Sequence, residues 1–111
     1  MAVTATVLIP AKIAEATQTT QYTSANVTTI IDKFTATNYS ATAATISVNL
    51  VPLGSAAGDA NLIVKAKTLQ PSETYTFPEL VGAALTAGGF ISTLAGTATA
   101  INIRASGRVI S

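Results

Sequence analysis

The stretch TTIIDKFTATNYSATAATISVNLVPL, residues 28–53, decides the fold class of this chain. Its second half alternates apolar and polar residues over 45–51, which is typical of a half-buried β-strand. The apolar face of that run holds Ile46, Val48 and Leu50. The first half alternates in a similar way over 29–37, and a small polar loop separates the two runs. The stretch therefore predicts two antiparallel strands joined as a hairpin with a longer connection.

Asp32 falls on the same predicted face as Ile30, Phe34 and Ala36. A carboxylate at this position either ends the burial or marks a β-bulge. If Asp32 points inward it needs a partner, for which we expect Arg104 or backbone N–H groups. If it is solvated at a rim instead, the predicted register of this strand is wrong by one residue.

The rest of the chain continues the β pattern. Further strands are predicted at 2–9, 62–69, 74–77, 90–95 and 100–104, with a turn or bulge at Ser106-Gly107 and a last strand or tail at 108–111. In the run LIVKAKTL, residues 62–69, we expect Leu62, Val64 and Ala66 to face inward and the two lysines to face water. Residues 11–16 fit a short helix or a second strand, and residues 17–26 fit a loop or an edge strand. Pro71 predicts a turn over 70–73.

One short helix is predicted over residues 78–87. Pro78 suits a first helical turn, and Gly88 suits a left-handed cap at the end. The apolar stripe of this helix would consist of Leu80, Val81, Ala84 and Leu85. We expect the helix to close one end of the fold.

The domain organisation follows from the length and the strand count. About eight short strands in 111 residues predict a single all-β domain over 1–111, an antiparallel β-sandwich of the jelly-roll type. Residues 1–10 are expected to form an edge strand that ends at Pro10, or else an extended N-terminal arm that reaches a neighbouring subunit.

The composition argues against several classes of function. The chain has no His and no Cys, which excludes Ser-His and Cys-His nucleophiles and the usual zinc ligand sets. Charged residues make up 10% of the chain and the net charge is +1, which argues against a nucleic-acid partner. No apolar run is long enough to cross a membrane. We expect no enzyme activity, no cofactor and no metal site.

Four groups of residues resemble known kinds of site, and each has a structural interpretation that is stronger. Glu73 and Glu79 resemble a hydrolase pair, but one follows a turn and the other suits a helix start. Asp59 and Asn61 could bind Ca²⁺, yet such a site needs more carboxylates. The possible sugar platform consists of Tyr22, Tyr39 and Tyr75, without any Trp. Asn26 and Asn38 match the glycosylation pattern, as expected by chance in a chain rich in Thr and Ser.

Five motifs carry a resemblance to a known family. They are IIDKFTATN (30–38), VNLVP (48–52), LQPSETYTFPELVG (69–82), GGFIS (88–92) and INIRASGR (101–108). Together they span nearly the whole chain, which resembles the capsid decoration, or cementing, proteins of short-tailed phages of the epsilon-fifteen type. No residue in these motifs has a chemical role that can be carried over.

The resemblance implies a jelly-roll-like structural protein on the outer capsid surface of a virion. It would bind a separate major capsid protein, bridge neighbouring capsomers and pair into dimers on the shell, after a period in the host cytoplasm during assembly. Our candidate contacts with the shell or with a second copy are Val3, Val7, Ile9, Lys12, Lys65 and Lys67. The alternative is a host-recognition or carbohydrate-binding β module of a tail or spike.

Overall fold

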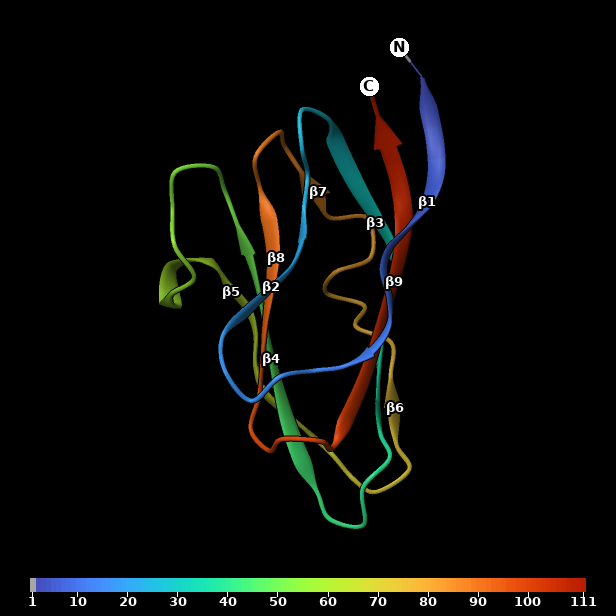
Figure 1. The fold of residues 1–111 in the computed structure, drawn as a ribbon, viewed down its shortest axis with the longest axis vertical. Coiled ribbons are helices and arrows are strands. Elements are labelled where there is room, and N and C mark those ends of the chain that lie inside the picture. The colour runs from blue at the N-terminus through green and yellow to red at the C-terminus, as the bar shows by residue number, and fades with distance from the viewer. Residues whose placement is uncertain (1) are drawn as a thin grey trace.

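The computed structural model describes residues 2–111 as two antiparallel sheets packed face to face (Figure 1). Sheet A has the order β1-β9-β3-β6, with a further short strand, β7, paired to β3. Its strands are β1 (Val3–Ile13), β9 (Ile101–Ile110), β3 (Thr28–Asn38), β6 (Thr74–Tyr75) and β7 (Ala84–Leu85). Sheet B has the order β2-β8-β4-β5, formed by β2 (Thr19–Thr23), β8 (Phe90–Ala95), β4 (Ala44–Val51) and β5 (Leu62–Leu69).

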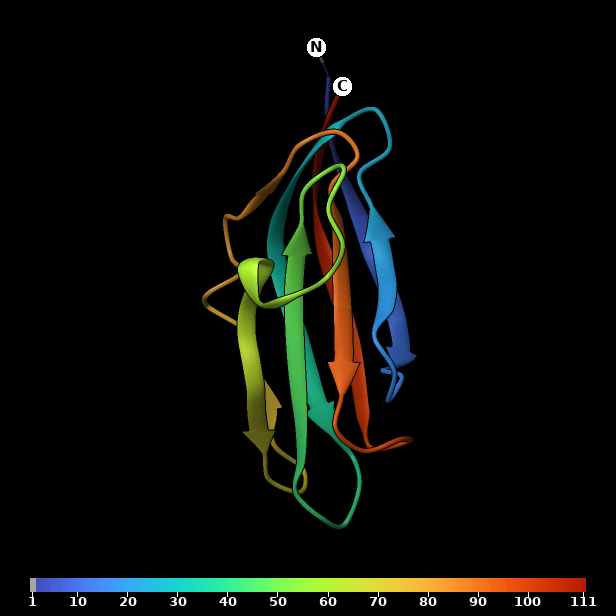
Figure 2. The ribbon, with the colours of Figure 1, turned by 90° about the vertical axis from the view of Figure 1, so that its left-hand side faces the viewer.

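The predicted jelly-roll-like sandwich is confirmed. Figure 2 shows sheet B in front of sheet A, and the chain changes layer between most successive strands, except from β4 to β5 and from β6 to β7. Apart from the short strand β7, each sheet contributes four strands, and two such sheets connected in this way are the arrangement of a jelly roll. The core between them is apolar, and Phe34 meets Phe77 edge to face with 4.8 Å between the ring centroids.

The predicted hairpin is wrong, although both of its strands exist. β3 lies in sheet A and β4 lies in sheet B, so residues 39–43 cross from one layer to the other. Each strand pairs with more distant partners, β3 with β9 and β4 with β8 and β5. A short loop between two alternating strands fits either a hairpin or a crossing between sheets, because both bury one face of each strand.

Asn38 fixes this crossing. Its side-chain amide donates to the carbonyl oxygens of Thr42 and Leu69, at 2.8 and 2.9 Å, and its oxygen accepts from both the backbone N–H and the hydroxyl of Ser40. The side chain is fully buried, so these bonds tie the crossing loop to the end of β5. The matched glycosylation pattern at Asn38 is therefore inaccessible in the folded protein.

The predicted helix over residues 78–87 is wrong. The segment runs along the edge of β3, where the N–H of Gly82 donates to the carbonyl of Ile31 and the N–H of Ile31 donates to that of Ala83. Gly82 has φ of +83°, and Phe77 has φ of +47°, which breaks helical geometry at both points. Leu80 and Leu85 are still buried, whereas Val81 is exposed. The one helical element in the described residues is a short 3₁₀ turn at Asp59–Asn61.

β1 and β9 are longer than predicted. β1 continues through Pro10 because the register shifts between Ile9 and Lys12, and a bulge on an edge strand tolerates a residue that cannot donate. β9 runs unbroken through Ser106-Gly107, where we expected a turn or bulge. The bulges lie instead on the two flanking strands, where Leu8 and Asp32 are the extra residues.

Gly107 allows the three strands to pack at these bulges. A Cβ atom at this position would collide with the carbonyl oxygen of Ile30 and would lie 3.0 Å from the Leu8 side chain. The close approach of neighbouring backbone therefore requires glycine here.

Candidate functional site

The outer face of sheet A is exposed to solvent and carries a distinct chemical pattern. Residues that lie directly opposite each other in antiparallel strands point to the same side of the sheet. Three rows therefore cross β1, β9 and β3 on the outside: Val3-Ile110-Thr28, Ala5-Arg108-Ile30 and Val7-Ser106-Lys33. The face continues beyond the second bulge of β1, which lies between Ile9 and Lys12. Two further sets of opposed residues belong to it, Arg104-Thr35 and Ile13-Asn102-Thr37.

The β1 side of this face is apolar. Val3, Val7 and Ile13 are 57%, 47% and 45% exposed, and all three lie on the edge strand. A shallow depression at the bulges adjoins them, lined by Ala5, Thr6, Val7, Asp32, Ser106 and Gly107. Several exposed aliphatic side chains on one strand are typical of a surface that another molecule covers.

The centre of the face is positively charged. Asp32 lies on the exposed side of β3 and binds Arg108 of β9, through Nε at 3.1 and 3.0 Å and through Nη2 at 2.9 Å. These bonds raise the pKa of Arg108 above its usual range. The expected partner Arg104 is therefore wrong, whereas the bulge considered at Asp32 is confirmed. Phe34 and Ala36 face inward as predicted, but before the bulge the predicted register is wrong, because Ile31 is turned inward and Ile30 is left half-buried on the outside.

Lys33 and Arg104 remain without a carboxylate partner among residues 2–111. They are diagonal neighbours on β3 and β9, since Lys33 lies opposite Ser106 and Arg104 lies opposite Thr35. Both side chains are exposed. Like charges at this separation repel each other, so a covering anion would stabilise them.

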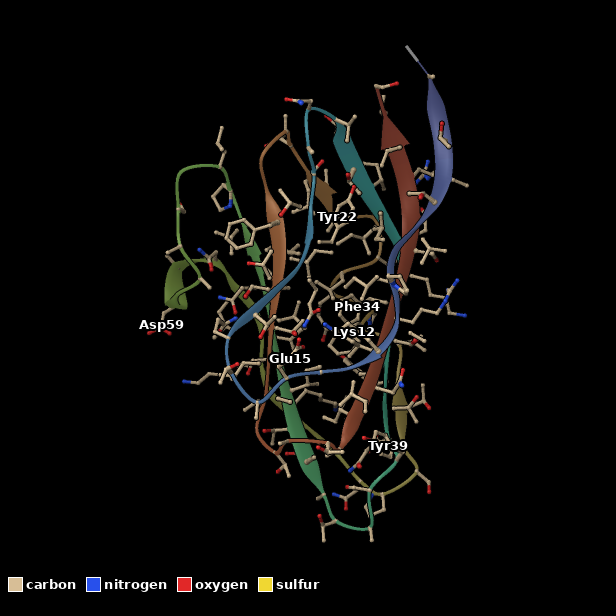
Figure 3. All side chains as sticks on the ribbon, viewed as in Figure 1. Lys12, Glu15, Tyr22, Phe34, Tyr39 and Asp59 are labelled. Carbon is tan, nitrogen blue, oxygen red and sulfur yellow. The ribbon has the colours of Figure 1, made fainter. Side chains whose placement is uncertain are left out.

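Two of the predicted contact lysines lie at the open edges of the sandwich and have partners within the chain. Lys12 donates to Glu15 at 2.9 Å beside β2, and Glu15 also accepts from Gln21 at 2.9 Å (Figure 3). The hydrogen bonds from Gln21 and then Lys12 lower the pKa of Glu15. At the opposite edge, Nζ of Lys67 lies 4.8 Å from the centroid of the Tyr75 ring.

The prediction that both lysines of β5 face water is correct only for Lys65. A bulge at Ala66, which has φ of +46°, separates the two lysines: Lys65 stays outside, while Lys67 lies opposite Ile46 on the inner side. Ala66 is exposed rather than inward. Long aliphatic stems let lysines at an edge reach inward and still hold the ammonium group at the surface.

The remaining predicted contacts are divided between core and surface. Ile9 is completely buried, so it belongs to the core and not to a contact surface. Lys65 lies on the outer face of sheet B, beside a small hollow lined by Gln18, Ser47, Asn49, Gly58, Asp59, Leu62 and Leu94. Val3 and Val7 are the two predicted contacts that the structure places on the outer face of sheet A.

The candidate carboxylates have structural partners. Glu73 accepts the N–H of Gln70 at 2.7 Å within its turn. Glu79 accepts the hydroxyl hydrogen bond of Tyr75, which lowers the pKa of Glu79 and raises that of Tyr75. Neither glutamate lines any of the surface hollows described above. Their geometry is that of turn and edge stabilisation.

The loop around Asp59 is held by amide hydrogen bonds. Asn49 donates to the carbonyl of Gly58 and to Oδ1 of Asn61, at 2.9 and 2.8 Å. Oδ1 of Asn61 thus already accepts hydrogen bonds, and residues 2–111 contain no cluster of three potential acidic, His or Cys metal ligands.

The three tyrosines are dispersed. Tyr22 packs against the core and bonds to Thr29, Tyr75 covers an edge, and Tyr39 is exposed in the crossing loop. Figure 3 places Tyr22 and Tyr39 in opposite halves of the molecule. They form no common platform.

The sequence contained one clear signal for the sheet A surface, the alternation of Val3, Val7 and neighbouring polar residues in an edge strand. It did not indicate that Lys33 and Arg104 would lie together, because that depends on the register between distant strands. In the described part of the chain, no helix is long and apolar enough to span a membrane. No protein family, no curated protein and no solved structure matches this chain.

Proposed function

We propose that this chain is a structural virion protein that binds the outside of an icosahedral phage capsid and stabilises the shell by bridging neighbouring capsomers. The proposal rests on the sequence resemblance and on one structural observation: an outer sheet face with an apolar edge and a charged centre. This face contains Val3, Val7 and Ile13 on β1.

The arrangement of the remaining residues supports a binding role rather than a chemical one. The candidate carboxylates serve a turn and a sheet edge, and the lysines at both edges cover the inner layer. The outer face of sheet A, built on the long strands β1, β9 and β3, therefore remains as the surface for contact with a partner. Since a decoration protein is present in many copies, a modest affinity at each contact is sufficient.

Binding to undecorated shells tests this proposal. Shells of the cognate major capsid protein, assembled without this chain, are titrated with purified protein, and bound protein is measured by co-sedimentation. We expect saturable binding and a higher temperature of shell disruption. Absence of binding to these shells would overturn the proposal.

A substitution on the proposed face makes the test specific. Val7→Asp places a charge in the exposed apolar row and should weaken shell binding, while Ile63→Asp changes a comparably exposed residue on β5, which is 42% exposed. Both variants should keep the β circular-dichroism signal. Adsorption to host cells or glycans with no shell binding would favour the tail or spike module instead.

A further inference from the structure

The side-chain charges of this protein are separated by face. The outer face of sheet A carries three cations, Lys33, Arg104 and Arg108, and the single carboxylate of Asp32, which gives it a net charge of +2. The other three cations and four carboxylates lie elsewhere and together carry a net charge of −1. The overall charge of +1 therefore conceals one clearly positive surface.

The positive charge is available for a partner at two positions. Arg108 forms an ion pair with Asp32, whereas Lys33 and Arg104 have no ion-pair partner within residues 2–111. Each lies within a long strand, and these two strands pair with each other here, with Lys33 opposite Ser106 and Arg104 opposite Thr35. A partner can thus meet these charges without ordering a flexible segment first.

Apolar and charged residues are arranged side by side on this surface. In one row, Val7 of β1, Ser106 of β9 and Lys33 of β3 follow one another across the sheet. The exposed aliphatic groups lie toward the edge strand, and the two unpaired cations lie toward the middle. A complementary surface would present carboxylates opposite the middle strands and apolar side chains opposite β1.

We propose that the outer face of sheet A docks on an acidic patch, flanked by apolar residues, on the outer surface of the shell protein. This inference rests on the proposed function and specifies which face binds and the chemistry of what it binds. Charge complementarity of this kind sets orientation and association rate more than affinity. It would place sheet A against the shell and leave the hollow on sheet B facing outward.

A protein surface fits these residues better than a polyanion does. Two unpaired cations supply few phosphate contacts, while nucleic-acid affinity grows with the number of phosphates neutralised. Exposed valine and isoleucine side chains also find no apolar counterpart on a phosphate backbone. The partner is therefore an acidic and apolar protein surface.

Matched charge reversals test the inference. Arg104→Glu and Lys65→Glu change the net charge equally, but the first lies on sheet A and the second on sheet B. We expect Arg104→Glu to weaken binding to undecorated shells by about tenfold, and Lys33→Glu to act similarly, since each reverses a contact charge. Lys65→Glu should stay within about twofold of the wild type, and Arg104→Lys should bind as the wild type does.

The outcomes separate the two proposals. If the wild type binds shells but Arg104→Glu and Lys65→Glu bind equally well, the docking face is wrong while the proposed function stands. If the wild type does not bind shells at all, the proposed function fails and this inference with it. Tight binding of the wild type to a duplex DNA probe that Arg104→Glu abolishes would overturn the choice of an acidic protein surface.

Salt dependence gives an independent readout. Raising the ionic strength from about 0.05 M to about 0.5 M should weaken wild-type binding and reduce its advantage over Arg104→Glu, because exposed charges are screened. An unchanged advantage at high salt would contradict an electrostatic contact.

Discussion

Arg108 of β9 donates hydrogen bonds from two of its guanidinium nitrogens to the carboxylate of Asp32 on β3. Asp32 is the extra residue of a β-bulge at this point. Both side chains are nearly half exposed. The pair therefore joins two strands on the surface of sheet A without removing either charge from water. The geometry of the pair is well defined, but solvent screening keeps its contribution to the free energy of unfolding small.

The first prediction concerns this pair. In a double-mutant cycle of Asp32→Ala and Arg108→Ala, we expect a small favourable coupling in urea unfolding that declines as salt is added. Neither single variant should alter the far-ultraviolet circular dichroism. A coupling that persists unchanged in high salt would contradict the description of an exposed, screened pair.

Gly107→Ala should destabilise the fold strongly. The added methyl group would collide with the carbonyl of Ile30 and crowd Leu8, so backbone must shift at both flanking bulges. We expect a loss of about 2–4 kcal/mol in the free energy of unfolding, measured by urea denaturation. Gly58→Ala is the control, since its Cβ would meet nothing closer than 4.0 Å, and it should be nearly neutral. Equal stability of the two variants would show that the close approach at Gly107 is not as described.

Asn38→Ala should also be costly. It removes a buried amide and takes away the side-chain donor of the Leu69 carbonyl, while the Thr42 carbonyl keeps only the hydroxyl of Ser40. A loss of about 2–4 kcal/mol is expected from the unsatisfied buried groups. Ser40→Ala removes a partly exposed hydroxyl from the same network and should cost about 1 kcal/mol or less. Thermal and urea unfolding of both variants check this order, and a larger effect of Ser40→Ala would refute it.

The two lysines of β5 should differ in their contribution to stability. Lys67→Gln loses the contact between the ammonium group and the Tyr75 ring at an exposed edge, worth about 0.5–1 kcal/mol. Lys65→Gln should leave the melting temperature unchanged. Identical melting temperatures for the two variants would contradict an edge-closing role for Lys67.

Acid should weaken the opposite edge. The pKa of Glu15 is lowered in the folded protein by hydrogen bonds from Gln21 and Lys12, so its ionised form stabilises the fold above its ordinary pKa of 4.5. That contribution should be lost as the pH falls through the lowered value. The stability difference between the wild type and Glu15→Gln is therefore expected to shrink from pH 7 to acidic pH. A difference independent of pH would show that the ionised carboxylate is not responsible.

Local alternation was enough to predict the sandwich and several strands. The bounds of β5 and β8 agree with the predicted 62–69 and 90–95, because continuous apolar patterns end there at turn residues. The same alternation could not distinguish a hairpin from a crossing between sheets. β3 and β4 carry equivalent patterns in both arrangements, and only their distant partners β9 and β8 decide.

The candidate surface was less predictable because β-bulges change which side chains of a strand face inward. The extra residues Leu8 and Asp32, and the kink at Ala66, each reverse which side chains face inward downstream. As a result Ile9, an expected surface contact, lies in the core, and Lys67 starts on the inner side of β5 and reaches the edge beside Tyr75. The predicted helix failed for another reason: its apolar spacing also fits an irregular segment that buries Leu80 and Leu85 separately along the edge of β3.

The first and last strands of the fold run antiparallel and side by side, and Ala2 exchanges two backbone hydrogen bonds of 3.0 Å with Ser111. Both ends of the described chain therefore emerge together at one tip of the long axis (Figure 1). A short linker could join them, and new termini could be opened in the exposed loop at Ser55-Ala56, with every strand pairing retained. The same closeness makes this tip a natural anchor for a fused cargo, which would extend along the long axis and leave both broad faces of the sandwich uncovered.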